Sequence, residues 1–118
     1  MRDDWLPPML KEWAQWYETS SGYSDSTTLW RAIMAPTQAG FGPSIPKGVE
    51  PPHSLSKLCR AMGDLLSDHS CGEDVAIVRA FYVLGIHGVL RHAGFSERKL
   101  YERVRCGEMA IRGYLKAI

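Results

Sequence analysis

Apolar residues between positions 55 and 66 recur at the spacing of an α-helix. The residues at i, i+3, i+4, i+7, i+10 and i+11 are Leu55, Leu58, Cys59, Met62, Leu65 and Leu66. This spacing places them on one buried face, so we predict a helix over residues 55–67 with Ser54 as its N-cap. No part of the chain keeps the alternation of a β-strand for more than a few residues, and the predicted fold class is therefore all-α.

Two further helices are predicted on either side of this one. Pro8 suits a first helical turn, so a helix is expected over residues 8–18, with an apolar stripe that we assign to the core: Met9, Trp13, Trp16 and Tyr17. A later helix is expected over residues 73–84, ended by Gly85, with these residues facing inward: Val75, Val78, Phe81 and Tyr82. The segment LWRAIMA at 29–35 is expected to form one or two helical turns.

A Pro/Gly-rich segment covers residues 35–52 and contains five prolines and three glycines. That density of helix breakers predicts a long loop. It carries Phe41, Ile45 and Val49, so it either lies against the core or is a disordered linker. The expected organisation is a single domain over 1–118, with an N-terminal helical segment (1–34), this loop, and a helical core (53–118).

Composition excludes several classes of protein. An apolar share of 45% and a charged share of 23% are ordinary for a globular domain. There is no window of apolar residues long enough to span a membrane, and the start MRDDWLPP lacks a secretion signal, so a cytoplasmic location is expected. The odd number of cysteines, Cys59, Cys71 and Cys106, predicts reduced thiols.

Residues with catalytic or metal-binding chemistry do not form a recognised motif. His53, Cys59, His69 and Cys71 lack the close pairing of structural zinc ligands, and Cys106 has no base placed beside it in sequence. Phosphate loops, HExxH motifs and paired carboxylates are absent. We predict no metal, no cofactor and no enzymatic activity.

Charge is distributed unevenly along the chain. Residues 86–118 hold seven basic and three acidic residues, a net charge of +4, whereas residues 1–85 hold seven basic and ten acidic residues, a net charge of −3. A basic end on a nearly neutral chain indicates a polyanionic partner, although a difference of this size also arises by chance.

The basic end carries the pattern of a helix-turn-helix motif at residues 86–117. Residues 86–93 supply a short helix, and Gly94 supplies a residue free to adopt positive φ. Phe95 is expected to fill the corner between the helices, and Ser96 to cap the second one. Leu90 departs from the pattern, because many such motifs have Ala there. A surface helix with solvated charges is the alternative interpretation.

The second helix has two distinct faces. Its inward stripe is formed by Leu100, Val104, Gly107, Ile111 and Tyr114, and its outward face by Arg98, Tyr101, Glu102 and Arg105, with Lys99, Arg103 and Cys106 beside them. Arg98, Glu102 and Arg105 are of types that contact guanine or cytosine edges in a major groove. Lys99 and Arg103 are suited to phosphates.

Several segments together resemble the phage antitermination Q proteins, in the shorter form found in lambdoid prophages other than lambda. The segments are EWAQWY, GY at 22–23, IPKGVEPP at 45–52, VAIVRAFYVLG at 75–85, GFSERKLYERVRCGE at 94–108 and IRGYL at 111–115. The C-terminal half also resembles region 4 of sigma factors, in which a Tyr-x-x-Gly helix precedes a Gly-x-Ser turn.

This resemblance implies a transcription antiterminator. Such a protein binds double-stranded DNA near a late promoter, in one or more copies, loads onto bacterial RNA polymerase paused there by sigma, and carries it through terminators. The implied DNA contacts are Ser96, Arg98, Lys99, Tyr101, Glu102, Arg103 and Arg105. The Pro/Gly-rich loop and the first helix are left free for the polymerase, with Phe41, Ile45 and Lys47 as candidate contacts. Two alternatives remain open: a helix-turn-helix repressor, and a small DNA-binding assembly component like a terminase subunit.

Overall fold

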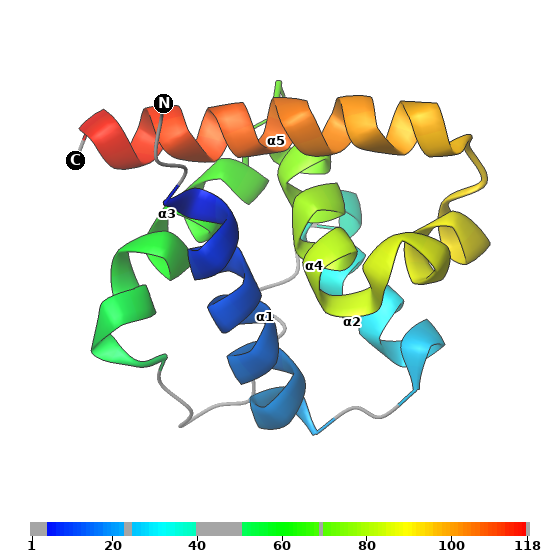
Figure 1. The fold of residues 1–118 in the computed structure, drawn as a ribbon, viewed down its shortest axis with the longest axis horizontal. Helices are drawn as coiled ribbons and strands as arrows, with labels where there is room; N and C mark the ends of the chain where they lie inside the picture. The colour runs from blue at the N-terminus through cyan, green and yellow to red at the C-terminus, as the bar shows by residue number, and fades with distance from the viewer. Residues whose placement is uncertain (1–4, 23–24, 40–50, 69, 118) are drawn as a thin grey trace.

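Helices account for all the regular structure in residues 5–22, 25–39, 51–68 and 70–117, which are the residues that this computed structural model describes. In chain order they are α1 (Leu6–Ser21), α2 (Ser26–Ala39), the 3-10 helix η1 (His53–Leu55), α3 (Ser56–Leu66), α4 (Gly72–Ala93) and α5 (Glu97–Ala117). The prediction of an all-α protein is confirmed (Figure 1).

Helix α4 is the central element, and it packs against α1, α2, α3 and α5. Its first half is buried on every side, with consecutive buried residues from Val75 to Ala80. A helix surrounded by partners is apolar all round, so the predicted single inward face was too narrow. Phe81 and Tyr82, predicted to face inward, are only partly buried.

Helix α1 supplies the largest buried side chains. Its two prolines occupy the first helical positions, and the helix begins two residues earlier than expected and extends to Ser21. Trp13 and Tyr17 are fully buried and in mutual contact, with ring centroids 5.2 Å apart. Met9 and Trp16 are partly buried against the same core. The assignment of this stripe to the core is confirmed.

Helix α2 is longer than predicted. The Asp25 carboxylate caps it by accepting hydrogen bonds from the backbone N–H groups of Thr27 and Thr28, at 3.0 and 3.2 Å. The helix continues through Pro36 to Ala39, so the loop does not begin at Ala35. A proline removes only one intrahelical hydrogen bond, and the helix is already held to the core by three buried residues: Leu29, Ile33 and Met34. Residues 40–50, which make up most of the rest of the predicted loop, lie outside the described residues.

Helix α3 shows the predicted apolar stripe, with Leu55, Leu58, Met62 and Leu65 buried and Cys59 and Leu66 partly buried. Its predicted cap is wrong. Ser54 lies inside η1, and the residue preceding α3 is Leu55, which makes no side-chain cap. The short 3-10 turn moves the start of α3 by one residue, from 55 to Ser56, and Ser56 donates from its hydroxyl to the carbonyl of His53.

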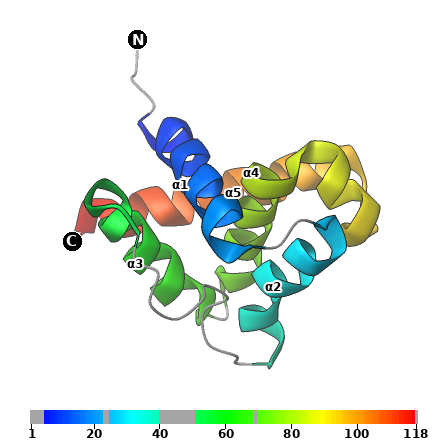
Figure 2. The ribbon, with the colours of Figure 1, turned by 90° about the horizontal axis from the view of Figure 1, so that it is seen from below.

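Helix α4 changes direction at Gly85, as the sequence predicts. Gly85 has φ 78° and ψ 173°, a conformation available in practice only to glycine. The residues after it, 86–93, form a separate short helical segment beside α2 (Figure 2). Helix α5 then runs along one side of the molecule, across α4 and α3 (Figure 1). None of the described helices combines the length and the apolar character needed to cross a membrane.

Candidate nucleic-acid interface

The turn between the short segment 86–93 and α5 has the predicted chemistry. Gly94 ends α4 in the left-handed region, at φ 76° and ψ 12°. The hydroxyl of Ser96 accepts a hydrogen bond from the backbone N–H of Lys99 at 3.2 Å, which caps α5. Phe95 is partly buried against the core. The predictions for Gly94 and Ser96 are confirmed.

The first half of α5 turns a continuous set of polar side chains outward. Leu100, Val104, Gly107 and Ile111 are buried and Tyr114 is partly buried, so the predicted inward stripe is confirmed. The exposed side chains on the other side are Arg98, Lys99, Tyr101, Glu102, Arg105 and Cys106. We call Arg98, Lys99, Tyr101, Glu102 and Arg105 the outer face of α5.

Arg98 is a highly accessible cation of the outer face, with 91% of its side chain exposed. Its Nε lies 3.9 Å from Oε1 of Glu102, one helical turn further on. Exposed ion pairs of this kind stabilise a helix by only about 0.3–0.5 kcal/mol. Arg98 is therefore held loosely and is free to exchange Glu102 for a ligand.

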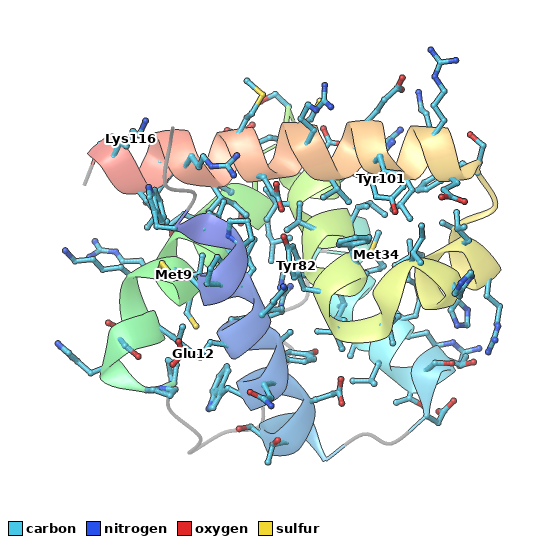
Figure 3. The ribbon with its side chains drawn as sticks, viewed as in Figure 1. Met9, Glu12, Met34, Tyr82, Tyr101 and Lys116 are labelled. Atoms are coloured by element: carbon cyan, nitrogen blue, oxygen red, sulfur yellow. The ribbon has the colours of Figure 1, made fainter. Side chains whose placement is uncertain are left out.

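Tyr101 joins the outer face to the core. Its ring contacts the ring of Phe81 edge-on, with centroids 6.1 Å apart, and Phe81 in turn contacts Tyr82 at 5.3 Å. The hydroxyl of Tyr82 donates to Oε2 of Glu108 at 2.6 Å. About half of Tyr101 is nevertheless exposed, and Figure 3 shows its place on α5, at the other end from Lys116.

Arg103 differs from the other basic residues of α5, because it is bound within the protein. Its Nη1 lies 3.3 Å from Oδ1 of Asp74 and 3.4 Å from Oε1 of Glu73, both in the first turn of α4. Its guanidinium also lies over the Phe95 ring, 5.9 Å from the centroid. A DNA phosphate would have to compete with two carboxylates, so this geometry favours a positioning role over the predicted phosphate contact.

The two histidines near the turn have different environments. His87 is exposed. His92 is partly buried and stacked on Trp30 of α2, with ring centroids 5.6 Å apart and an interplanar angle of 18°. Helix α2 therefore covers His92 on that side of the short segment. The sequence carries no local signal of this contact between distant residues.

The three cysteines are free thiols. Burial raises the pKa of Cys59, and burial also raises the pKa of Cys71, with a smaller contribution from Asp68. A raised pKa lowers the thiolate fraction, which is the form that attacks electrophiles and binds metals. Within the described residues no three His, Cys, Asp or Glu side chains group to hold a metal ion. His69 lies outside those residues.

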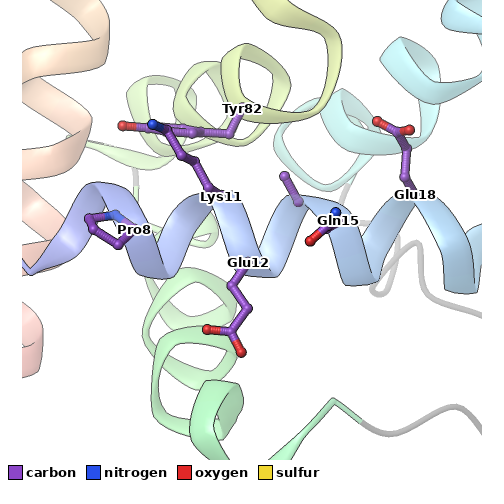
Figure 4. A pocket seen from close by; sticks show the side chains of 7 residues that line it. Pro8, Lys11, Glu12, Gln15, Glu18 and Tyr82 are labelled. Atoms are coloured by element: carbon purple, nitrogen blue, oxygen red, sulfur yellow. The ribbon is translucent and has the colours of Figure 1, made fainter.

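A hollow of about 600 Å³ lies along α1, where Figure 4 shows its lining side chains. Lys11, Glu12, Gln15 and Glu18 line it from α1, and Tyr82 lines it from α4. Charges of both signs line the hollow, with neither a thiol nor an imidazole among them.

Among the described residues, the predicted DNA contacts come together on the outer face of α5, at the helix that follows Gly94 and is capped by Ser96. The candidate polymerase contacts Phe41, Ile45 and Lys47 lie outside the described residues. The chain matches no family model, no curated protein and no solved structure.

Proposed function

We propose that this protein is a transcription antiterminator that binds double-stranded DNA through the N-terminal half of α5 and then travels with bacterial RNA polymerase. In this proposal Arg98, Glu102 and Arg105 contact base edges, and Lys99, Tyr101 and Ser96 contact the backbone. Arg103 fastens α5 to α4 and does not touch DNA.

The observation that carries DNA binding is the combination of the turn and the outer face. A short helical segment, a left-handed Gly94 and a capping Ser96 lead into a helix whose first turns expose Arg98 and Lys99. In helix-turn-helix proteins the same end of the second helix enters the major groove. Arg91, also exposed, stands on the preceding segment, the one that crosses the DNA backbone in such motifs.

The polymerase part of the proposal is supported by the resemblance to antitermination Q proteins along segments such as 75–85 and 94–108. In this proposal the Pro/Gly-rich segment contacts polymerase through Phe41, Ile45 and Lys47.

DNA binding is tested by selecting duplexes from a random-sequence library and measuring the affinity of variants for the selected sequence. Arg98→Ala is expected to cost about 1–3 kcal/mol and to relax the preference at one base pair. Lys99→Ala should weaken binding to all sequences alike and reduce the salt slope by about 1. Lys116→Ala, on the far end of the same helix, is the matched control and should leave binding unchanged.

Antitermination is tested by transcription with purified polymerase through an intrinsic terminator, on a template that carries the selected element near the promoter. Wild-type protein should increase read-through. The double variant Phe41→Ser with Ile45→Ser should bind DNA within about threefold of wild type, a shift of roughly 0.7 kcal/mol, yet lose read-through. Circular dichroism must show that its helices and melting are intact. Tight DNA binding with no read-through by wild type would instead identify a repressor.

A further inference from the structure

A second hollow lies at the opposite end of α5 from the outer face, where α1, η1, α3 and α5 meet. It has a volume of about 430 Å³. Trp5, which precedes α1, and Met9 of α1 line it, together with His53 of η1, Lys57 of α3, Leu115 of the last turns of α5 and two serines. Pockets of several hundred Å³ are large enough to take one or two side chains of a partner. We call it the α1–α3 pocket.

The apolar walls of the α1–α3 pocket are incompletely covered. Trp5 is 40% exposed, one of three large hydrophobic residues that are exposed among the described residues. Met9 and Leu115 are only partly buried. Exposed tryptophan beside further apolar side chains is typical of the anchor positions of protein interfaces, which are enriched in Trp and Arg.

Among the described residues, the titratable side chains that line this pocket are basic ones, Lys57 and His53, and no carboxylate of the described residues lines it. Arg60, one turn after Lys57 on α3, and Lys116, next to Leu115 on α5, are exposed cations as well. The nearest carboxylate further along α3, Asp64, already accepts a hydrogen bond from the hydroxyl of Tyr114.

We infer that the α1–α3 pocket binds an acidic, amphipathic segment of a partner protein. One large apolar side chain of that segment packs against Trp5, Met9 and Leu115, and a neighbouring carboxylate meets Lys57. The complementary charge selects this partner over a basic or neutral one, because apolar contact alone discriminates weakly.

The α1–α3 pocket is far enough from the outer face for both to be occupied together. Leu115 and Arg98 are separated by 17 residues of α5, which corresponds to about 25 Å along the helix axis. The inference therefore adds a contact for a protein partner to the DNA contact proposed above. It stands whether or not the outer face binds DNA.

The test is a random peptide-display library, panned on the full-length protein, followed by affinity measurements with the enriched peptides. The expected enrichment is for sequences in which Leu, Phe or Trp is flanked by Asp and Glu. Trp5→Ala and Lys57→Glu should each lower the affinity for the enriched peptide by about tenfold or more. Lys11→Glu, an exposed charge reversal on α1 outside the pocket, is the matched control and should change affinity less than twofold or so. Lys57 is exposed, so the melting temperature of Lys57→Glu should stay near that of wild type. Trp5 is 40% exposed, so the affinity of Trp5→Ala is compared at a temperature where circular dichroism shows that this variant is folded.

Nuclear magnetic resonance locates the bound peptide independently of the variants. The indole N–H signal of Trp5 should shift on titration, while that of the buried Trp13 should not. Enrichment of basic or neutral sequences, no enrichment, or binding indifferent to Lys57→Glu would each overturn the inference. A concentration-dependent dimer in sedimentation that Trp5→Ala dissolves would also overturn it, because the pocket would then be an interface between two copies of this chain.

Discussion

Gly107 of α5 lies directly against the main chain of Asp74 in α4. A Cβ built on Gly107 would come within 2.6 Å of the Asp74 carbonyl oxygen and 2.4 Å of Cγ2 of Val78. The absence of a side chain at Gly107 therefore sets how closely the two helices cross. The adjacent ion pairs of Arg103 with Glu73 and Asp74 depend on the same crossing.

Gly107→Ala is expected to destabilise the protein by about 1–3 kcal/mol, because the added methyl group must push apart a packed crossing. The higher helix propensity of alanine, worth about 1 kcal/mol, offsets only part of that cost. Gly113→Ala on the same helix is the control. Its Cβ would meet nothing within 4 Å, so it should stabilise by about 0.5–1 kcal/mol. Urea unfolding measures the change in the free energy of unfolding for both variants. A change of the same sign in the two variants would contradict the close crossing of α4 and α5 at Gly107.

Gly85→Ala is expected to destabilise the protein by about 1–3 kcal/mol through backbone strain alone. Gly85 has φ 78° and ψ 173°, and a Cβ there would contact nothing within 4 Å. Since the added methyl group makes no steric clash, the measured loss of stability equals the cost of the backbone strain at the kink. Gly63→Ala in α3, also without close neighbours, should not destabilise. A melting temperature of Gly85→Ala equal to that of wild type would mean that the backbone at residue 85 can leave the positive-φ conformation without cost.

The turn into α5 could be predicted from the sequence because its causes are local. Gly94 is suited to a left-handed residue and Ser96 to a cap whatever surrounds them. The apolar stripes of α3 and α5 were likewise visible in residue spacing. The full length of α2 could not be predicted, because the prolines and glycines after residue 35 indicate a loop there. The apolar face of Leu29, Ile33 and Met34 predicts only one or two helical turns before it.

Contacts between distant segments could not be predicted. Arg103 has the same neighbours in sequence as a phosphate-binding arginine would have, and only the crossing of α4 and α5 brings Glu73 and Asp74 to it. The burial of Arg79 depends in the same way on α1 folding over α4. The α1–α3 pocket combines residues from positions 5 to 115, a separation at which spacing carries no information.

Arg103→Met is expected to lower the free energy of unfolding by about 1 kcal/mol, from two partly exposed ion pairs and a cation–π contact. It should leave the salt dependence of DNA binding unchanged once folding is complete. Lys99→Met, at an exposed position, should do the reverse: little effect on stability and a salt slope reduced by about 1. A reduced slope for Arg103→Met would restore the phosphate contact predicted from the sequence.

Asp25→Asn tests the charge of the α2 cap through its pH dependence. Hydrogen bonds from the Thr28 hydroxyl and then the Thr27 backbone lower the pKa of Asp25 below its ordinary 3.8. Because the pKa of Asp25 is lower in the folded than in the unfolded state, its charged carboxylate stabilises the folded protein above pH 3.8. This stabilisation is lost as the pH falls through the folded-state pKa. The melting temperature of wild type should therefore be higher than that of Asp25→Asn at neutral pH. The difference between the two melting temperatures should disappear in acid below pH 3.8. A gap that is constant with pH would exclude the charge as its cause.

Arg79→Met is expected to raise the free energy of unfolding by about 1 kcal/mol or more. Arg79 is only 5% exposed, and burial lowers its pKa. Its guanidinium lies over Trp13 and Tyr17 at 5.2 and 5.7 Å, yet Nε and Nη1 have no hydrogen-bond partner among the described residues. Cation–π contacts of about 2 kcal/mol each do not offset a burial cost of several kcal/mol per ion, and methionine fills similar space without charge.

Arg79→Lys separates the charge from the volume at this position. Lysine keeps the charge but loses the flat guanidinium that stacks on Trp13 and Tyr17, so it should be less stable than wild type, whereas Arg79→Met should be more stable. Urea unfolding at neutral pH orders the three proteins. The free energy of unfolding of Arg79→Met could instead fall by several kcal/mol, as expected when one partner of a buried ion pair is removed. That result would mean that the Arg79 guanidinium is paired with an anion from outside the described residues.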